Sequence, residues 1–288
     1  MGGTGSRVFS LCVVLAFVRG AARCVLVARL VFMRILVTFA VEAEFAPWRG
    51  RHEFLPAQTS SNGQVYTTSL SGVDVLVGLT GIGPRAASDS IRAFTWAEDL
   101  DLCLTTGFAG ALRPEHRVAD ILAAREIVAQ DKRSNIFDGK IQCTQRLLKM
   151  AAACGARVVE RFYSSPSLIR MAKEKSALRD LADAVEMESF EVLAEAFAWM
   201  PEGIAVRAVS DTVDEDLPLD FSQMVIGQGE LSMARLAAQI VRKPSAIPGL
   251  IRLGKRSSEA AEKLADFLDT FLAALAGKSV AIASKEAR

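Results

Sequence analysis

Acidic side chains are the residues of this 288-residue chain best suited to catalysis. Glu42 and Glu44 lie two apart, as do Glu186 and Glu188, and Asp211 follows an apolar run. The two histidines form no H-E-x-x-H motif, and neither lies in a recognisable setting for a nucleophile. We therefore expect acid–base chemistry to rest on carboxylates, with no metal site and no cofactor.

The first acidic pair directly follows the apolar run Ile35–Ala40, which predicts a buried strand. Taken alone, Glu42 and Glu44 fit a solvated strand end or a first helical turn, where acids favour the positive helix terminus. The same position also suits a ligand site, because ligands collect at the carboxyl ends of strands in open α/β sheets.

The second acidic pair lies in the segment 183–191, which reads D-A-V-E-M-E-S-F-E. One interpretation is the charged face of an amphipathic helix. The other places Met187 and Glu188 beside a ligand at the start of the following helix. A carboxylate there can accept two charge-assisted hydrogen bonds from a vicinal diol.

Asp211 ends the segment Arg207-Ala-Val-Ser210-Asp211, after a β-rich run. It fits an N-cap for the residues that follow. A strand-end aspartate shielded from water also fits a general acid, because loss of solvation favours the protonated carboxyl group.

A glycine loop follows the predicted strand Val73–Leu79 and includes Thr80 and Gly81. Residues 81–86 match the G-x-G-x-x-A dinucleotide pattern, but the acidic residue expected at the end of the next strand is missing. We therefore interpret the loop as a place where backbone approaches a small ligand closely.

The order of the predicted elements indicates an α/β fold, specifically a single domain with a central mixed β-sheet flanked by helices. The acids and the glycine loop all follow strands, so we expect them to meet at one edge of the sheet. Strands are predicted over 35–40, 65–69, 73–79, 102–106, 118–126, 158–162 and 204–209, and helices over 85–96, 145–154, 189–199, 231–241 and 257–275.

Residues 1–32 do not fit this alternation. The apolar run Val8–Val18 is too short to span a bilayer, which needs about 20 residues. With Arg7 before it, it imitates a secretory signal weakly, whereas a translation start at Met33 would leave it outside the protein. We interpret 1–32 as an extension, either a non-native start or a weak targeting-like segment, and 33–288 as the folded domain.

Bulk composition excludes several classes of partner. The net charge of +1 favours neither nucleic acid nor an anionic membrane, and five scattered cysteines without a C-x-x-C pair indicate a reducing compartment. We expect a cytoplasmic protein with no nucleic-acid or membrane partner. The basic stretch 241–256 is typical of an anionic partner or of a solvated connector between helices, and we favour the connector.

These segments together resemble the nucleoside phosphorylase and nucleosidase superfamily, in particular the bacterial methylthioadenosine/S-adenosylhomocysteine nucleosidases. The resemblance implies a catalytic domain over 33–288 that needs no cofactor, a place in methionine salvage, and a homo-oligomer, most simply a dimer. The matching segments, in order from about Met33 to Asp216, are Ala40–Glu44, Thr80–Gly83, Thr106–Gly110, Val118–Ile121, Val185–Glu188 and Arg207–Asp211.

The resemblance also implies a role for each acid in cleaving the N-glycosidic bond of a purine-type nucleoside. Glu44 corresponds to the water-activating glutamate, Glu188 to the sugar-binding glutamate, and Asp211 to the acid that protonates purine N7. These roles suit an oxocarbenium-like transition state. The other implied binding residues are Thr80 and Gly81 near the sugar, Met187 against the ribose, Ser210 beside Asp211, and Phe162 on the purine, with Tyr163 and Phe108 as alternatives.

The acceptor and the substrate stay open at this point. The superfamily's phosphorylases hold phosphate with arginines near the fourth strand, but Leu104–Gly110 contains none. A dianion needs charged donors, so we expect water, although Arg85 leaves phosphorolysis open. The segment 159–168 looks more like hopanoid-pathway phosphorylases and futalosine hydrolases. A noncatalytic nucleoside-binding protein is the remaining alternative; binding alone needs Glu188 more than Glu44 or Asp211.

Overall fold

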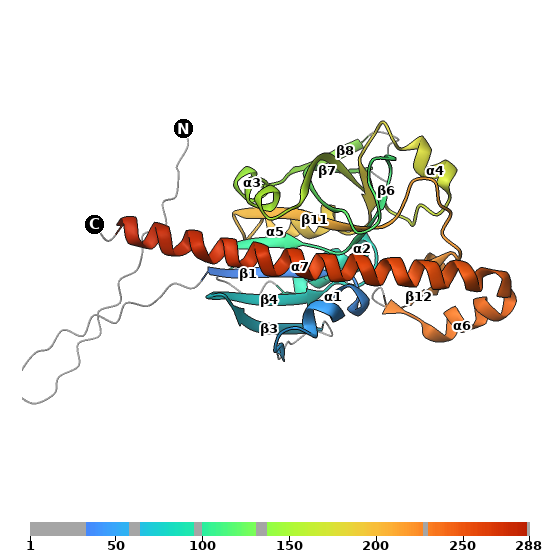
Figure 1. The fold of residues 1–288 in the computed structure, drawn as a ribbon, viewed down its shortest axis with the longest axis horizontal. Helices are drawn as coiled ribbons and strands as arrows, with labels where there is room; N and C mark the ends of the chain where they lie inside the picture. The colour runs from blue at the N-terminus through green and yellow to red at the C-terminus, as the bar shows by residue number, and fades with distance from the viewer. Residues whose placement is uncertain (1–32, 58–63, 95–99, 131–136, 227–229, 287–288) are drawn as a thin grey trace, which may run out of the picture. The chain divides into compact units, whose positions relative to one another are not determined.

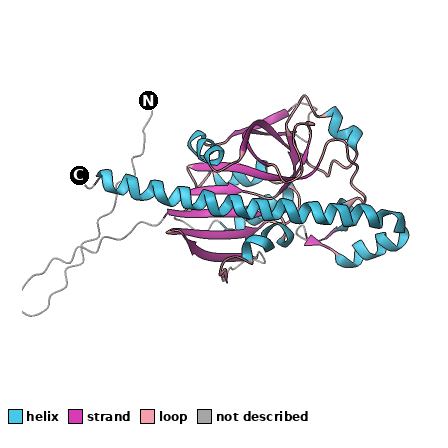
Figure 2. Cartoon of the chain, in the orientation of Figure 1, coloured by secondary structure: helices cyan, strands magenta, loops and turns pink. Residues whose placement is uncertain are grey.

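The computed structural model of the chain describes residues 33–57, 64–94, 100–130, 137–226 and 230–286. The expectations for residues 1–32, and for 95–96 of one predicted helix, lie outside the described residues. Figure 2 shows the helices and strands of the described residues.

The strands are β1 (Met33–Phe39), β2 (Leu55–Pro56), β3 (Val65–Leu70), β4 (Val73–Leu79), β5 (Leu102–Thr105), β6 (Phe108–Ala111), β7 (Ile121–Gln130), β8 (Phe137–Gln142), β9 (Arg157–Ser164), β10 (Ala184–Glu186), β11 (Glu202–Asp211), β12 (Val225–Ile226) and β13 (Glu230–Leu231). The helices are α1 (Glu42–Arg49), α2 (Pro84–Phe94), α3 (Gln145–Ala153), α4 (Ala172–Ala177), α5 (Ser189–Ala196), α6 (Met233–Arg242) and α7 (Ile247–Glu286), with the short 3-10 helices η1 (Phe221–Met224) and η2 (Pro244–Ala246).

The central sheet runs in the order β2-β3-β4-β1-β5-β11-β6-β10-β9-β7-β8. Strand β1 pairs in parallel with β4 and β5, and β11 pairs in parallel with β5 and β6. Antiparallel pairs, such as β3 with β4, make the sheet mixed. The predicted α/β fold with a central mixed sheet is confirmed, and the carboxyl ends of β4, β1, β5 and β11 lie at the same edge.

One part of the sheet closes on itself. Strand β11 pairs with both β6 and β7, and β6 connects through β10 and β9 back to β7. The five strands therefore form a ring of pairings. In this ring β6 lies between β10 and β11, antiparallel to β10 and parallel to β11. The end of β10 therefore lies beside the start of β6.

Helix α7 packs across the sheet and against α1 (Figure 1). Its inward face is apolar and buried, and the Trp48 indole N–H on α1 donates to Asp269 on α7 at 2.8 Å. The helix begins ten residues earlier than the sequence predicts, because Pro248 lies in its first turn, where a missing N–H costs no intrahelical bond. Within the described residues, no helix is both long and apolar enough to cross a membrane.

Candidate active site

Glu44 lies in the first turn of α1, directly after β1, and is buried. Its Oε2 accepts from the backbone N–H groups of Ala40 (2.8 Å) and Val41 (3.2 Å), and its Oε1 from that of Phe108 (2.8 Å). Burial raises the pKa of Glu44 above its ordinary value, while attraction to Arg207 and these three N–H groups oppose the rise. The result is a fixed carboxylate that is more basic than one in water.

Glu188 lies directly before α5 and is also buried. Its Oε1 accepts a hydrogen bond from the backbone N–H of Gly83, 2.8 Å away in the glycine loop. Burial and the neighbouring charge of Glu186 raise the pKa of Glu188 to about 8. The glycine loop and the segment after β10, 105 residues apart in the chain, therefore meet at this carboxyl group.

Arg207, on β11, connects these acids and is almost fully buried. Its Nη2 donates to Glu186 at 2.7 Å and to Ser189 at 2.9 Å, and lies 3.9 Å from a Glu188 oxygen. Burial alone would favour a neutral guanidine, but attraction to Glu186 and Glu188 raises the pKa of Arg207. Three acids, Glu44, Glu186 and Glu188, thus share one guanidinium.

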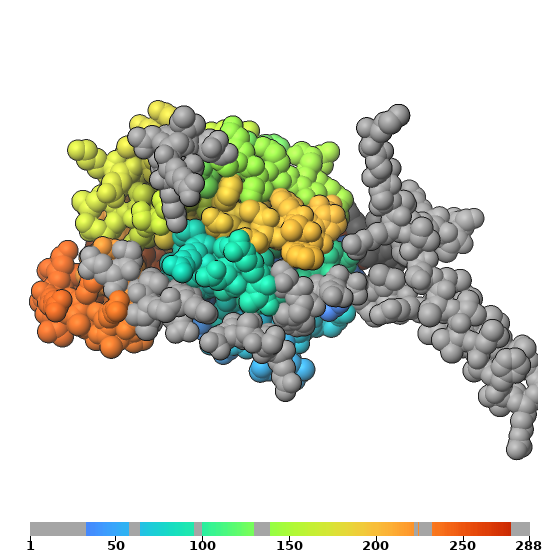
Figure 3. All heavy atoms as spheres, turned by 180° about the vertical axis from the view of Figure 1, so that it is seen from behind, coloured from blue at the N-terminus to red at the C-terminus, as the bar shows by residue number. Residues whose placement is uncertain are grey.

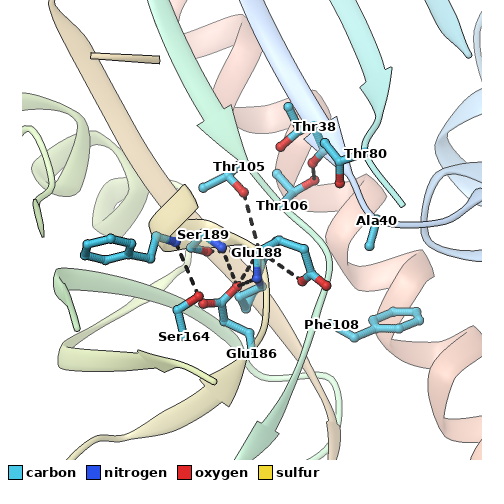
Figure 4. A network of polar contacts seen from close by, with 12 residues as sticks. Thr38, Ala40, Thr80, Thr105, Thr106, Phe108, Ser164, Glu186, Glu188 and Ser189 are labelled. Carbon is cyan, nitrogen blue, oxygen red and sulfur yellow. Dashed lines mark hydrogen bonds and ion pairs between the residues drawn. The ribbon is translucent and has the colours of Figure 1, made fainter. Parts of the chain in front are cut away.

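Glu186 is an anchor for this arrangement. Its Oε2 also accepts from the backbone N–H groups of Glu188 (2.9 Å) and Ser189 (2.7 Å), at the start of α5. Figure 4 shows Glu186, Glu188 and Ser189 side by side, with Thr105 nearby. One carboxyl group therefore fixes both the guanidinium and the position of Glu188.

Asp211 ends β11 and is paired separately. Its Oδ1 accepts from the hydroxyl of Ser210 at 2.7 Å, and its Oδ2 forms an ion pair with the ammonium of Lys175 on α4. Lys175 is completely buried and donates to the carbonyl oxygens of Thr212 (3.0 Å) and Glu215 (2.9 Å) as well. All three ammonium donors are thus used, so Asp211 shares its site with a fixed cation.

Strand β6 and the loop before it run alongside both parts of the site. A Cβ atom added to Gly107 would lie 2.7 Å from Glu44 Oε1, and one added to Gly110 would lie 3.0 Å from Asp211 Oδ2. Gly107 has φ +135°, which other residues rarely adopt, so both space and backbone require glycine there. Three residues of roughly 3.3 Å each separate the two positions, about 10 Å in all.

The remaining sequence candidates are placed as follows. Thr80 is buried, and its hydroxyl donates to the carbonyl oxygens of Phe39 (3.3 Å) and Gly81 (3.1 Å). Gly81 has φ +78°, consistent with a tight loop. The Met187 side chain lies beside Gly83, where an added Cβ atom would be 3.6 Å from its methyl carbon. The loop that contains Thr80 and Gly81 reaches Glu188 through the backbone N–H of Gly83, and Met187 lies beside that glycine.

The three aromatic residues considered for stacking on the purine differ in burial. Phe162 has no exposed surface and belongs to the main hydrophobic core, and Tyr163 packs in a second buried cluster. Phe108 is only partly buried, and its backbone N–H binds Glu44. In the labelled view its ring points away from the acidic cluster (Figure 4). Of the three rings, only that of Phe108 has appreciable exposed surface.

Arg85 does not join the site. Its side chain is 94% exposed and lies 3.9 Å from Asp89 on the outer side of α2. Among the described residues, no group of three or more histidine, cysteine or acidic side chains is arranged to hold a metal ion. The residues that sequence reasoning missed are Lys175 and the anchoring role of Glu186 toward Arg207, and neither has a local motif to reveal it.

Comparison with known proteins identifies the family and the fold. The family model described as "Phosphorylase superfamily" matches residues 34–242. Among solved structures, 5'-methylthioadenosine/S-adenosyl homocysteine nucleosidase from Helicobacter pylori is 16% identical with a TM-score of 0.64, covering 84% of this chain and 98% of its own. The S. pneumoniae nucleosidase is 17% identical with the same TM-score, covering 84% and 100%.

A second kind of enzyme has a similar fold. Futalosine hydrolase of Helicobacter pylori strain 26695 is 17% identical with a TM-score of 0.60, covering 83% of this chain and 98% of its own. At these identities the solved structures show only that the fold is shared. The family is shown by the family model, which matches most of the chain. The chain therefore belongs to the phosphorylase superfamily and is an enzyme of that family.

Proposed function

We propose that this enzyme hydrolyses the N-glycosidic bond of a purine-type nucleoside. In this proposal Glu188 binds the ribose hydroxyls, Glu44 removes a proton from the attacking water, and Asp211 delivers a proton to the departing base. Water adds to the anomeric carbon as the bond from that carbon to the base nitrogen breaks, so free base and free sugar are released.

The observation that carries the proposal is the excess of acids at the sugar end. Glu44, Glu186 and Glu188 share the single guanidinium of Arg207. Positive charge develops on the ribosyl group as its bond to the base breaks, and fixed carboxylates stabilise that charge without reorganising. The raised pKa of Glu44 also suits a group that must accept a proton near neutral pH.

The base end suits proton donation. In the proposed step a proton passes from the Lys175 ammonium through the Asp211 carboxylate to the departing base, and Ser210 fixes the orientation of that carboxylate. The transfer leaves a neutral lysine amine beside the carboxylate, and exchange with solvent restores the ammonium. The sequence predicts Asp211 with Ser210 beside it, and the buried cation is what the structure adds.

Water is favoured over phosphate by the same charges. A phosphate dianion approaching the anomeric carbon would meet three acids and one guanidinium, which is already bound to Glu186. Arg85, the arginine of the glycine loop, is turned to solvent. Repulsion of this kind weakens dianion binding and leaves neutral water unaffected.

The substrate class that we propose is a nucleoside like 5'-methylthioadenosine or S-adenosylhomocysteine. Support comes from the solved structures with the same fold, one of which holds 5'-methylthioadenosine in its active site. Futalosine is the second candidate, because futalosine hydrolase has the same fold at a similar identity. A homodimer and a place in methionine salvage remain parts of this proposal.

The test is a chromatographic assay of purified protein on a panel of adenosine, inosine, 5'-methylthioadenosine, S-adenosylhomocysteine and futalosine, with and without phosphate. We expect free base and free sugar, at a rate that phosphate does not change. A steep rise with phosphate and the appearance of a sugar 1-phosphate would replace hydrolysis by phosphorolysis. Binding of these nucleosides without release of base would indicate a noncatalytic binding protein.

A further inference from the structure

The segment formed by α6, η2 and the first three turns of α7 differs from the rest of the chain in charge. Residues 231–258 contain no acidic side chain, whereas the whole protein has nearly equal numbers of acids and bases. We call residues 231–258 the basic segment. Its six cationic residues are Arg235, Arg242, Lys243, Arg252, Lys255 and Arg256.

Exposed aliphatic side chains accompany these charges. On α6, Met233 is 70% and Val241 80% exposed, and both lie on one helix face with the exposed Ala237 between them. On α7, Ile247 and Ile251 are exposed four residues apart. Leu236 and Ile240 lie on the adjoining part of the same apolar face and pack inward, so this face of α6 is anchored along one side and exposed along the other. A solvated connector would not need exposed aliphatic side chains there.

The cations lie where an anionic surface can reach them. Arg242, Lys243, Arg252 and Lys255 are exposed, and Lys255 continues the helix face that carries Ile247 and Ile251. The first turn of α7 has no acidic residue, so the positive helix end adds to the side-chain charge. Figure 3 shows this segment as the orange region at the left of the view.

We infer that the basic segment docks on an anionic phospholipid surface. Amphipathic helices with cations beside exposed aliphatic side chains bind at the interface of such membranes without spanning them. The pattern fits a nucleic acid less well, because the segment has no aromatic side chain for base stacking. The small net charge of the whole chain conceals this local separation, which is why composition alone predicts no membrane partner.

The experiment is co-sedimentation of the full-length protein with vesicles of phosphatidylcholine alone or with 30% phosphatidylglycerol. We expect binding only to the anionic vesicles, and its loss in 0.5 M salt. Arg242→Gln with Lys243→Gln should lower the partition coefficient about 30-fold, at roughly a factor of five for each charge. Val241→Asp should lower it at least about 10-fold through lost apolar burial.

Matched controls make the same kinds of substitution at exposed positions outside the basic segment. Leu55→Asp and Arg85→Gln change side chains that are 58% and 94% exposed, and both should bind vesicles like the unmodified protein. The circular dichroism spectrum and the Tm of Val241→Asp should match those of the unmodified protein, which shows that the variant is folded. This inference does not depend on the proposed reaction, because vesicle binding is measured without substrate.

Three outcomes would overturn the inference. The first is equal binding to neutral and anionic vesicles, or no binding to either. The second is a dimer that Val241→Asp converts to a monomer while vesicle binding stays the same, which would assign this face to a second copy of the chain. The third is binding to a nucleic acid, but not to vesicles, that only the charge variant loses.

Discussion

The two ends of the site hold their acids in different ways. At the end that we propose for the sugar, Glu44, Glu186 and Glu188 lie around Arg207 and are held by backbone N–H groups. At the base end, Asp211 has a buried cation of its own, Lys175. The first arrangement has an excess of negative charge, and the second is neutral. The difference suggests that one end is built to stabilise a cation and the other to move a proton.

The largest expected effect comes from Glu44, the acid that we propose activates water. Glu44→Gln keeps the hydrogen-bond acceptor for Phe108 but removes the base, so kcat should fall about 10²–10⁴-fold. KM for the best nucleoside of the panel should change little. Steady-state kinetics would measure both, and a kcat within threefold of the unmodified enzyme would exclude Glu44 as the base.

The next effect concerns the neutral pair. Lys175→Met leaves the carboxylate of Asp211 buried without its cation and should lower the free energy of unfolding by about 3–5 kcal/mol. Lys175→Met with Asp211→Asn removes both charges and should recover most of that loss while staying inactive. Urea unfolding of the two single variants and the double variant gives the coupling energy. Additive losses would show that the two charges do not depend on each other.

The smallest effect comes from Glu188, whose role in nucleoside binding can be measured separately from its effect on the stability of the fold. Glu188→Gln should raise KM about 10–100-fold above pH 8, where Glu188 is ionised and its charge-assisted bonds to the ribose are lost. The raised pKa of Glu188 means that the folded protein binds more protons than the unfolded chain between about pH 4.5 and 8. This acid therefore reduces stability as pH rises through that window.

The Tm difference between Glu188→Gln and the unmodified protein should accordingly favour the variant more at pH 8 than at pH 5. Thermal unfolding at the two pH values checks the sign. A variant that loses stability equally at both values would show that Glu188 is ionised without cost in the folded state.

The sequence predicts those features that have local patterns. Strand periodicity was enough to predict the fold class and to place Glu44 and Asp211 at the ends of β1 and β11, and the apolar run after Glu188 placed that acid at the start of a helix. The short strand β10 before Glu188 was not predicted. Lys175 has no such pattern, because it lies in the short polar helix α4, 36 residues from its partner. Its burial is decided by how α4 packs on the loop after β11.

Phe162 illustrates a limit of a different kind. The side chain of an aromatic residue in a strand points to one of the two faces of the sheet. A shift of the strand register by one residue turns it to the other face. The pairing of β9 with β7 and β10 turns Phe162 into the core, where it has no exposed surface. Motif order cannot settle that choice, because it depends on partners far away in the chain.

The spacing of Gly107 and Gly110, just before and within β6, has a consequence for how such enzymes diversify. Because one short segment runs past both Glu44 and Asp211, backbone geometry sets the distance between these acids and, in the proposed reaction, the span from the reacting sugar carbon to the departing base. Substrates can then differ only at their outer ends, in the group beyond the ribose or at the far edge of the base. A constant distance between the two acids lets substrate recognition evolve while the bond-breaking step stays the same.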